Sequence, residues 1–90
     1  MKTYMANPDK IERMVTVMTR KEEILYMQTR LLRLAASHWS HSDDEIQSIF
    51  VKYGVYEYIE DGYELFHLEG DEAVLQEIAE MLKRKGVDLK

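Results

Sequence analysis

The sequence predicts an all-α fold, a single small bundle of four to five helices. Apolar residues recur at spacings of three and four through most of the chain, which is the period of an amphipathic helix. One Pro and four Gly leave few places for the tight turns that many short strands require. Ninety residues make one domain at most, so we expect a single domain over 1–90, with 1–20 as an N-terminal extension.

The first helix is expected to run from Pro8 to about Met18. Asn7 can cap this helix, and Pro8 suits the first helical position. Thr19 and Glu22 then have the spacing of a capping box, which predicts a new helix start. No Gly or Pro separates the two helices, so they could also fuse into one long helix. We expect a break or a bend between them.

The next helix is expected from Glu22 to about Ser37. Its apolar residues form a heptad-like seam, namely Ile24, Met27, Leu31 and Leu34, and this face is widened by Leu25, Leu32 and Ala35. An apolar face of this breadth suits a helix that packs between two neighbours of its own domain. A pair of such seams could also form a homodimer, and the chain would then be a self-assembling structural protein.

Two further helices are expected to meet at Gly54. Ser42–Glu45 has the form of a second capping box, and the helix that it opens runs to Tyr53. Gly54 is a typical helix stop, because Gly adopts the left-handed conformation without a steric penalty. The apolar spacing resumes at once and predicts one helix over 55–67.

The expected 55–67 helix contains a glycine, and a final helix follows it. Gly62 costs about 1 kcal/mol of helix stability relative to Ala, and its place on the apolar face could let another helix approach closely. Asp71–Lys85 is the last expected helix, since its apolar residues are periodic and its cations lie in the last turn. Gly86 stops this helix, and residues 87–90 form a tail.

The stretch around Gly54 resembles a known family. The matching residues are Tyr53-Gly54-Val55, Tyr58-Ile59, Tyr63, Phe66-His67 and Gly70. This pattern resembles a bacterial family of small helical proteins of uncharacterised function, over about 22–85. Members are often encoded beside ADP-ribosyltransferase-like proteins, so the resemblance implies a role as an antitoxin or partner of such a protein. The chain departs from the pattern at Phe66, where Leu is usual, and at Leu68-Glu69, where small hydroxyl residues are usual.

The net charge of −5 conceals a division along the chain. Residues 1–40 carry seven Lys/Arg and four Asp/Glu, a net +3, while residues 41–82 carry one Lys and twelve Asp/Glu, a net −11. Residues 83–90 return to +3. An acidic middle favours a basic protein partner, or a second copy of the chain with its ends exchanged. It argues against nucleic acid, because phosphate binding requires positive charge at the contact.

We expect the protein to be located in the cytoplasm. The first thirty residues hold no apolar run of signal-peptide length, and no stretch is long and apolar enough to span a membrane. We therefore expect no membrane partner. The chain has no Cys, which excludes disulfides and thiolate metal ligands and leaves the redox compartment open.

The sequence predicts no catalytic, cofactor-binding or metal-binding residue, and hence no enzyme. His38, His41 and Asp43 are the nearest approach to a metal cluster, but the set lacks a further ligand. His67 could act as a general base or as a hydrogen-bond donor to a partner. It could instead cap a helix C-terminus. We favour this structural role, because no nucleophile or acid lies at a sequence spacing typical of a catalytic pair.

The expected function is that of a non-enzymatic intracellular protein-interaction module. Tyr56 lies off the apolar face among carboxylates, as amphipathic rings at interfaces often do. An acidic and aromatic surface is therefore the predicted contact face for a basic partner, and its residues are Tyr56, Glu57, Glu60, Asp61, Glu64 and His67. The alternative is the dimer formed through the apolar seam of the 22–37 helix.

Overall fold

The computed structural model describes residues 18–89, and these residues form five helices and no strand. The helices are α2 (Arg20–Trp39), α3 (Asp43–Lys52), α4 (Val55–Asp61), α5 (Tyr63–Glu69) and α6 (Asp71–Arg84). The predicted all-α class is confirmed for this part of the chain. The helix expected from Pro8 to Met18 lies almost wholly outside the described residues.

The start of α2 is set by the predicted capping box. Thr19 is in an extended conformation, its hydroxyl accepts a hydrogen bond from the Glu22 amide, and its own amide donates to the Glu22 carboxylate at 2.9 Å. This reciprocal pair satisfies two amides that a helix start leaves unbonded. α2 therefore begins at Arg20, as the capping box predicts. Whether a helix precedes it, and hence the expected break, lies outside the described residues.

The breaks between α2 and α3 and between α3 and α4 lie where the sequence predicted them. Ser42 and Glu45 form the second capping box and open α3. Gly54 ends the α3 corner with a φ of 70°, in the left-handed region that other residues avoid. Both predictions are confirmed, because each depends only on hydrogen bonds or sterics within a few residues.

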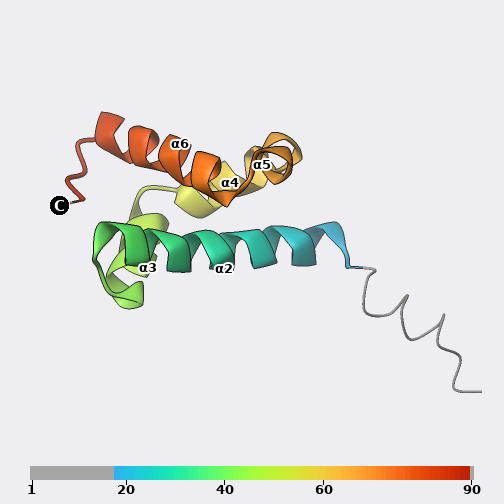
Figure 1. Ribbon diagram of the computed structural model, residues 1–90, viewed down its shortest axis with the longest axis horizontal. Coiled ribbons are helices and arrows are strands. Elements are labelled where there is room, and N and C mark those ends of the chain that lie inside the picture. The colour runs from blue at the N-terminus through green and yellow to red at the C-terminus, as the bar shows by residue number, and fades with distance from the viewer. Residues whose placement is uncertain (1–17, 90) are drawn as a thin grey trace, which may run out of the picture.

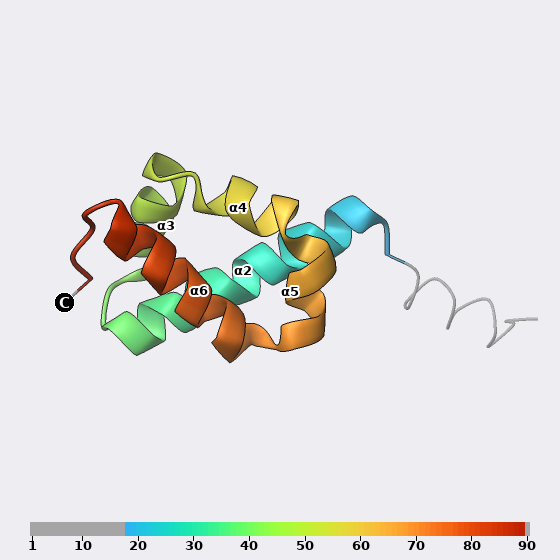
Figure 2. The same ribbon diagram turned by 90° about the horizontal axis from the view of Figure 1, so that it is seen from above.

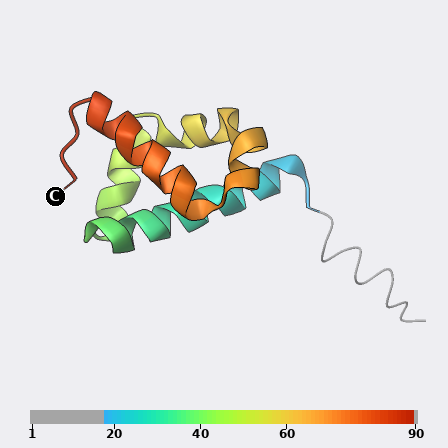
Figure 3. The same ribbon diagram turned by 45° about the horizontal axis from the view of Figure 1, so that its top comes forward.

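α2 lies along one side of the group, with α4, α5 and α6 together on the same side of it (Figure 1). α2 contacts α3, α4 and α6, and α5 contacts α4 and α6. Seen from above, α6 crosses α2 diagonally (Figure 2), and α3 and α5 lie at opposite ends of the group (Figure 3). The chain after α6 returns to the corner between α2 and α3, where the His41 ring lies 3.0 Å from the carbonyl oxygen of Leu89.

The core is formed by side chains from all five helices. Those with no exposed area are Leu31 and Ala35 of α2, Ile46 and Phe50 of α3, Val55 and Ile59 of α4, and Val74, Ile78 and Leu82 of α6. Phe66 of α5 is 6% exposed. No polar or charged side chain is buried within residues 18–89, so burial of apolar area is the main source of stability.

The apolar seam of α2 faces this core. Met27 and Leu31 are buried, and Ile24 and Leu34 are half-buried. The prediction that this seam could form a dimer interface is wrong for this fold, because the central side chains of the seam already pack against α3, α4 and α6. The first alternative, packing within the domain, is the one observed.

The single helix expected over 55–67 is also wrong. α4 ends at Asp61, Gly62 has a φ of −95° and a ψ of 7°, and α5 begins at Tyr63. The ring of Phe66 lies against the Gly62 backbone, so that a β-carbon added at Gly62 would come within 2.4 Å of it. The space left by this glycine is therefore filled by the ring of Phe66 rather than by another helix.

Among the helices of residues 18–89, none combines the length and the apolar character that crossing a membrane requires.

Gly62→Ala is expected to lower the free energy of unfolding by about 1–3 kcal/mol, because the new methyl group overpacks a buried ring. Urea denaturation of the purified protein measures this change. The same substitution in a Phe66→Leu background should cost less, because the smaller side chain leaves room for the methyl group. An unchanged unfolding midpoint for Gly62→Ala would contradict the proposed role of Phe66.

Candidate functional site

Three carboxylates form an exposed stripe on α4. Glu57, Glu60 and Asp61 are all exposed, and their spacing of three and four places them on one face of the helix. None of them has a salt bridge within the part of the chain that the structure describes. We call these three residues the α4 acidic stripe. The stripe comprises three of the six residues that the sequence predicts for the contact face.

Tyr56 is less exposed than the sequence predicted. The residue is half-buried, and its ring meets Phe50 edge-on at a centroid distance of 5.5 Å. The Tyr56 hydroxyl donates a hydrogen bond to the side-chain oxygen of Gln47. The backbone carbonyl of Tyr56 accepts a hydrogen bond from the side-chain amide of Gln28 at 2.9 Å. Burial raises the pKa of Tyr56. Tyr56 thus joins α4 to α2 and α3, and the expectation of a freely exposed ring is wrong.

Glu64 and His67 lie on α5 and take part in a separate cluster. The Glu64 carboxylate pairs with Arg20 of α2, and its other oxygen lies 3.8 Å from the His67 ring. The His67 ring stacks on Tyr63 at 5.1 Å, and the Arg20 guanidinium lies 4.9 Å from the centroid of the same Tyr63 ring. The six predicted contact residues therefore divide into the α4 acidic stripe, the packed Tyr56, and this cluster between α2 and α5.

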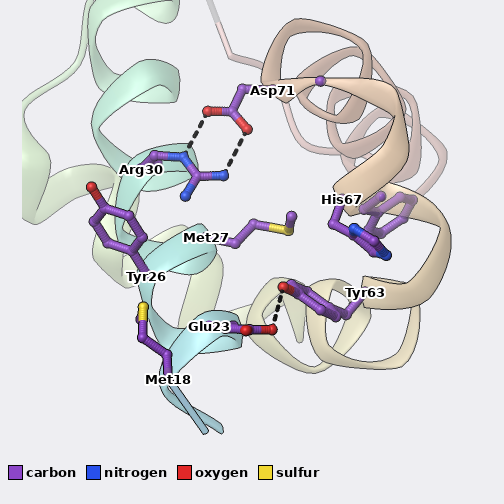
Figure 4. Close-up of a pocket in the computed structure, with 10 residues that line it drawn as sticks. Met18, Glu23, Tyr26, Met27, Arg30, Tyr63, His67 and Asp71 are labelled. Carbon is purple, nitrogen blue, oxygen red and sulfur yellow. Dashed lines mark hydrogen bonds and ion pairs between the residues drawn. The ribbon is translucent and has the colours of Figure 1, made fainter. Parts of the chain in front are cut away.

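A pocket of about 240 Å³ lies beside the cluster, between α2 and the α5–α6 corner (Figure 4). The buried side chains of Met27 and Phe66 contribute its apolar surface. The remaining lining residues are Met18, Glu23, Tyr26, Arg30, Tyr63, His67, Gly70 and Asp71. Of these ten residues, only His67 belongs to the contact face that the sequence predicted.

The polar side chains of the pocket bind one another across the gap. The Tyr63 hydroxyl donates to Glu23 at 2.9 Å, and Arg30 donates to both oxygens of Asp71, at 2.9 and 3.1 Å. Burial and the hydrogen bond to Glu23 raise the pKa of Tyr63. The hydrogen bonds from Arg30 lower the pKa of Asp71. These polar groups join α2 to α5 and α6, so their first role is to hold the elements together.

His38, in the last turn of α2, and His41, just after this helix, contact different elements. His38 lies 3.5 Å from Glu72 of α6, while His41 lies 3.4 Å from Glu45 of α3 and 3.0 Å from the Leu89 carbonyl oxygen. No group of three or more His, Asp or Glu side chains that could hold a metal ion occurs in residues 18–89. The arrangement of His38, His41 and Asp43 that was considered as a metal cluster is therefore not formed.

Comparison with known proteins gives one family. The model of the family described as "Protein of unknown function (DUF3791)" matches residues 26–85, two thirds of the chain, and the chain belongs to this family. The matched region runs from the middle of α2 to the end of α6 and so includes the α4 acidic stripe and most of the pocket. Searches of curated proteins and of solved structures found no match.

Asp71→Asn is expected to reduce the free energy of unfolding at pH 7 by about 0.5–1 kcal/mol, a modest value because both partners are about one-third exposed to solvent. The folded state lowers the pKa of Asp71, so the contribution is present above the unfolded pKa of about 4 and disappears as the pH falls through the lower folded value. Urea denaturation at pH 7 and near pH ~2.5 measures the difference.

Asp44→Asn is the matched control, because Asp44 also lies in the first turn of a helix but has no salt bridge within residues 18–89. It separates the loss of the Arg30 pair from the loss of a favourable helix-dipole charge. A difference between wild type and Asp71→Asn that is the same at both pH values would contradict the ion-pair account.

Proposed function

We propose that this protein is a non-enzymatic interaction module that binds a basic protein through the α4 acidic stripe. The observation that carries the proposal is the absence of any salt bridge to Glu57, Glu60 or Asp61 within residues 18–89. Other acidic side chains of the described chain, such as Glu64 and Asp71, do have cationic partners. The stripe thus offers negative charge that the fold itself does not use.

The stripe also has an unfavourable effect on its own helix. Like charges three and four residues apart destabilise a helix by about 0.2–0.5 kcal/mol per pair, and Glu57 has such neighbours in Glu60 and Asp61. α4 has no basic residue in its last turn to offset this repulsion. A basic surface placed against the stripe would remove the repulsion, and the local negative potential would steer such a partner toward it.

We further propose that the partner is an ADP-ribosyltransferase-like protein and that the chain acts as its antitoxin or accessory partner in the bacterial cytoplasm. The support for this identity is the resemblance described in the sequence analysis, which implies that members of the family are often encoded beside such proteins. It is independent of the geometry of the stripe. The general proposal that a basic partner binds at α4 does not depend on this identity.

The variant Glu57→Lys/Asp61→Lys is expected to lose the partner. Both side chains are exposed, so the folded state should persist, and circular dichroism checks this. Affinity capture of the tagged full chain from its own host, followed by mass spectrometry, should recover a stoichiometric basic protein with the wild type. The double variant should capture at least about tenfold less of the same protein, since two attractive charges become repulsive.

Asp44→Lys/Glu80→Lys is the control with the same change of net charge. Both positions are exposed and lie on α3 and α6, outside the stripe. The control should capture as much partner as the wild type. A higher salt concentration should weaken capture by the control and by the wild type alike. Equal capture by the stripe variant and the control would contradict the proposal.

A further inference from the structure

A second stripe of residues runs along α2 beside the buried seam. Lys21, Leu25, Gln28 and Leu32 follow one another at spacings of four, three and four, which is again a heptad pattern. We call these four residues the α2 outer stripe. Leu25 is 61% exposed in the structure, whereas Gln28 and Leu32 are half-buried. The outer stripe therefore presents one prominent apolar side chain on an otherwise regular helix face.

Two shallow hollows flank Leu25 along the helix. The first, of about 460 Å³, lies between α2 and α4 and is lined by Arg20, Lys21, Ile24, Leu25, Gln28 and Glu60. The second, of about 440 Å³, lies toward α3 and is lined by Leu25, Gln28, Thr29, Leu32, Gln47 and Tyr56. An exposed leucine next to a hollow that Ile24 also lines has the shape of a knob beside a hole. This is the geometry by which one helix packs against another.

The hollow between α2 and α4 also carries one unpaired charge of each sign. Lys21 lies on its α2 wall and Glu60 on its α4 wall, and neither has a salt bridge within residues 18–89. A two-fold axis at this hollow would turn each lysine toward the glutamate of the other molecule. The same surface thus carries the knob (Leu25) and the hole that would receive it, and also a positive and a negative charge. Such a surface is complementary to itself, as a two-fold interface requires.

We propose that the α2 outer stripe is the interface between two copies of this chain. The two α2 helices pack antiparallel near Ile24, and Leu25 of each copy enters the α2–α4 hollow of the other. Lys21 of each copy pairs with Glu60 of its neighbour. Glu60 also belongs to the α4 acidic stripe, but Glu57 and Asp61 do not line the hollow. These two carboxylates remain open to a basic partner in the dimer, so this inference does not rest on the proposed function.

Leu25→Glu tests the knob. Sedimentation equilibrium of the full chain from micromolar to millimolar concentration should show a monomer–dimer equilibrium for the wild type. The variant should remain monomeric, or its dissociation constant should rise about tenfold or more. Val51→Glu is the matched control, because Val51 on α3 is exposed to the same degree, 62% against 61% for Leu25, and makes the same apolar-to-acid change. This control should dimerise like the wild type.

Charge reversal tests the arrangement of the two copies. Lys21→Glu and Glu60→Lys should each weaken the dimer, and the double variant should recover it to within about threefold of the wild type, because each reversed charge again faces its opposite. A wild type that stays monomeric at millimolar concentration overturns the proposal. A dimer that survives Leu25→Glu, or a double variant no stronger than the single ones, overturns it as well.

Discussion

The described structure depends on the burial of one face of α2. Leu31 and Ala35 have no exposed area, and Met27 is 2% exposed, because α3, α4 and α6 all pack against this face. With no buried polar side chain in residues 18–89, apolar burial on α2 holds α3, α4 and α6, and α5 packs in turn on α4 and α6. α4 and α5 have only seven residues each, too short to be stable helices in isolation. The position of α4 is therefore set by α2, and that of α5 by its packing on α4 and α6 and its polar contacts with α2.

The same constraint divides the surface into parts with different chemistry. The face of α2 that is not buried carries Leu25 and Lys21, and the polar side of α4 carries the α4 acidic stripe. The Arg30–Asp71 ion pair joins α2 to α6, the Tyr63–Glu23 hydrogen bond joins α2 to α5, and the two border a pocket from two sides (Figure 4). The exposed faces of α2 and α4 are thus held in a fixed orientation, because the opposite faces of the same helices are buried in the core.

Local signals in the sequence were sufficient for much of the fold. The capping boxes at Thr19 and Ser42, the left-handed Gly54 and the apolar seam each depend on residues within one or two turns. The break at Gly62 was missed, because the apolar spacing continues through it and does not reveal where the Phe66 ring packs. The pocket could not be predicted, since its bonds join residues about forty positions apart, such as Glu23 and Tyr63. The exposure of Leu25 was likewise hidden, because two heptad stripes overlap on α2 and only the packing decides which one is buried.

Hydrogen exchange of individual amides in the native protein tests the central role of α2 most directly. If the other helices depend on its buried face, the amides of residues 27–36 should exchange only through global unfolding, with the full free energy of unfolding. The amides of α5, which packs at one end of the group, should exchange at lower free energy through local opening (Figure 3). Slower exchange in α5 or α6 than in the centre of α2 would show that the fold is held together elsewhere and would contradict this account.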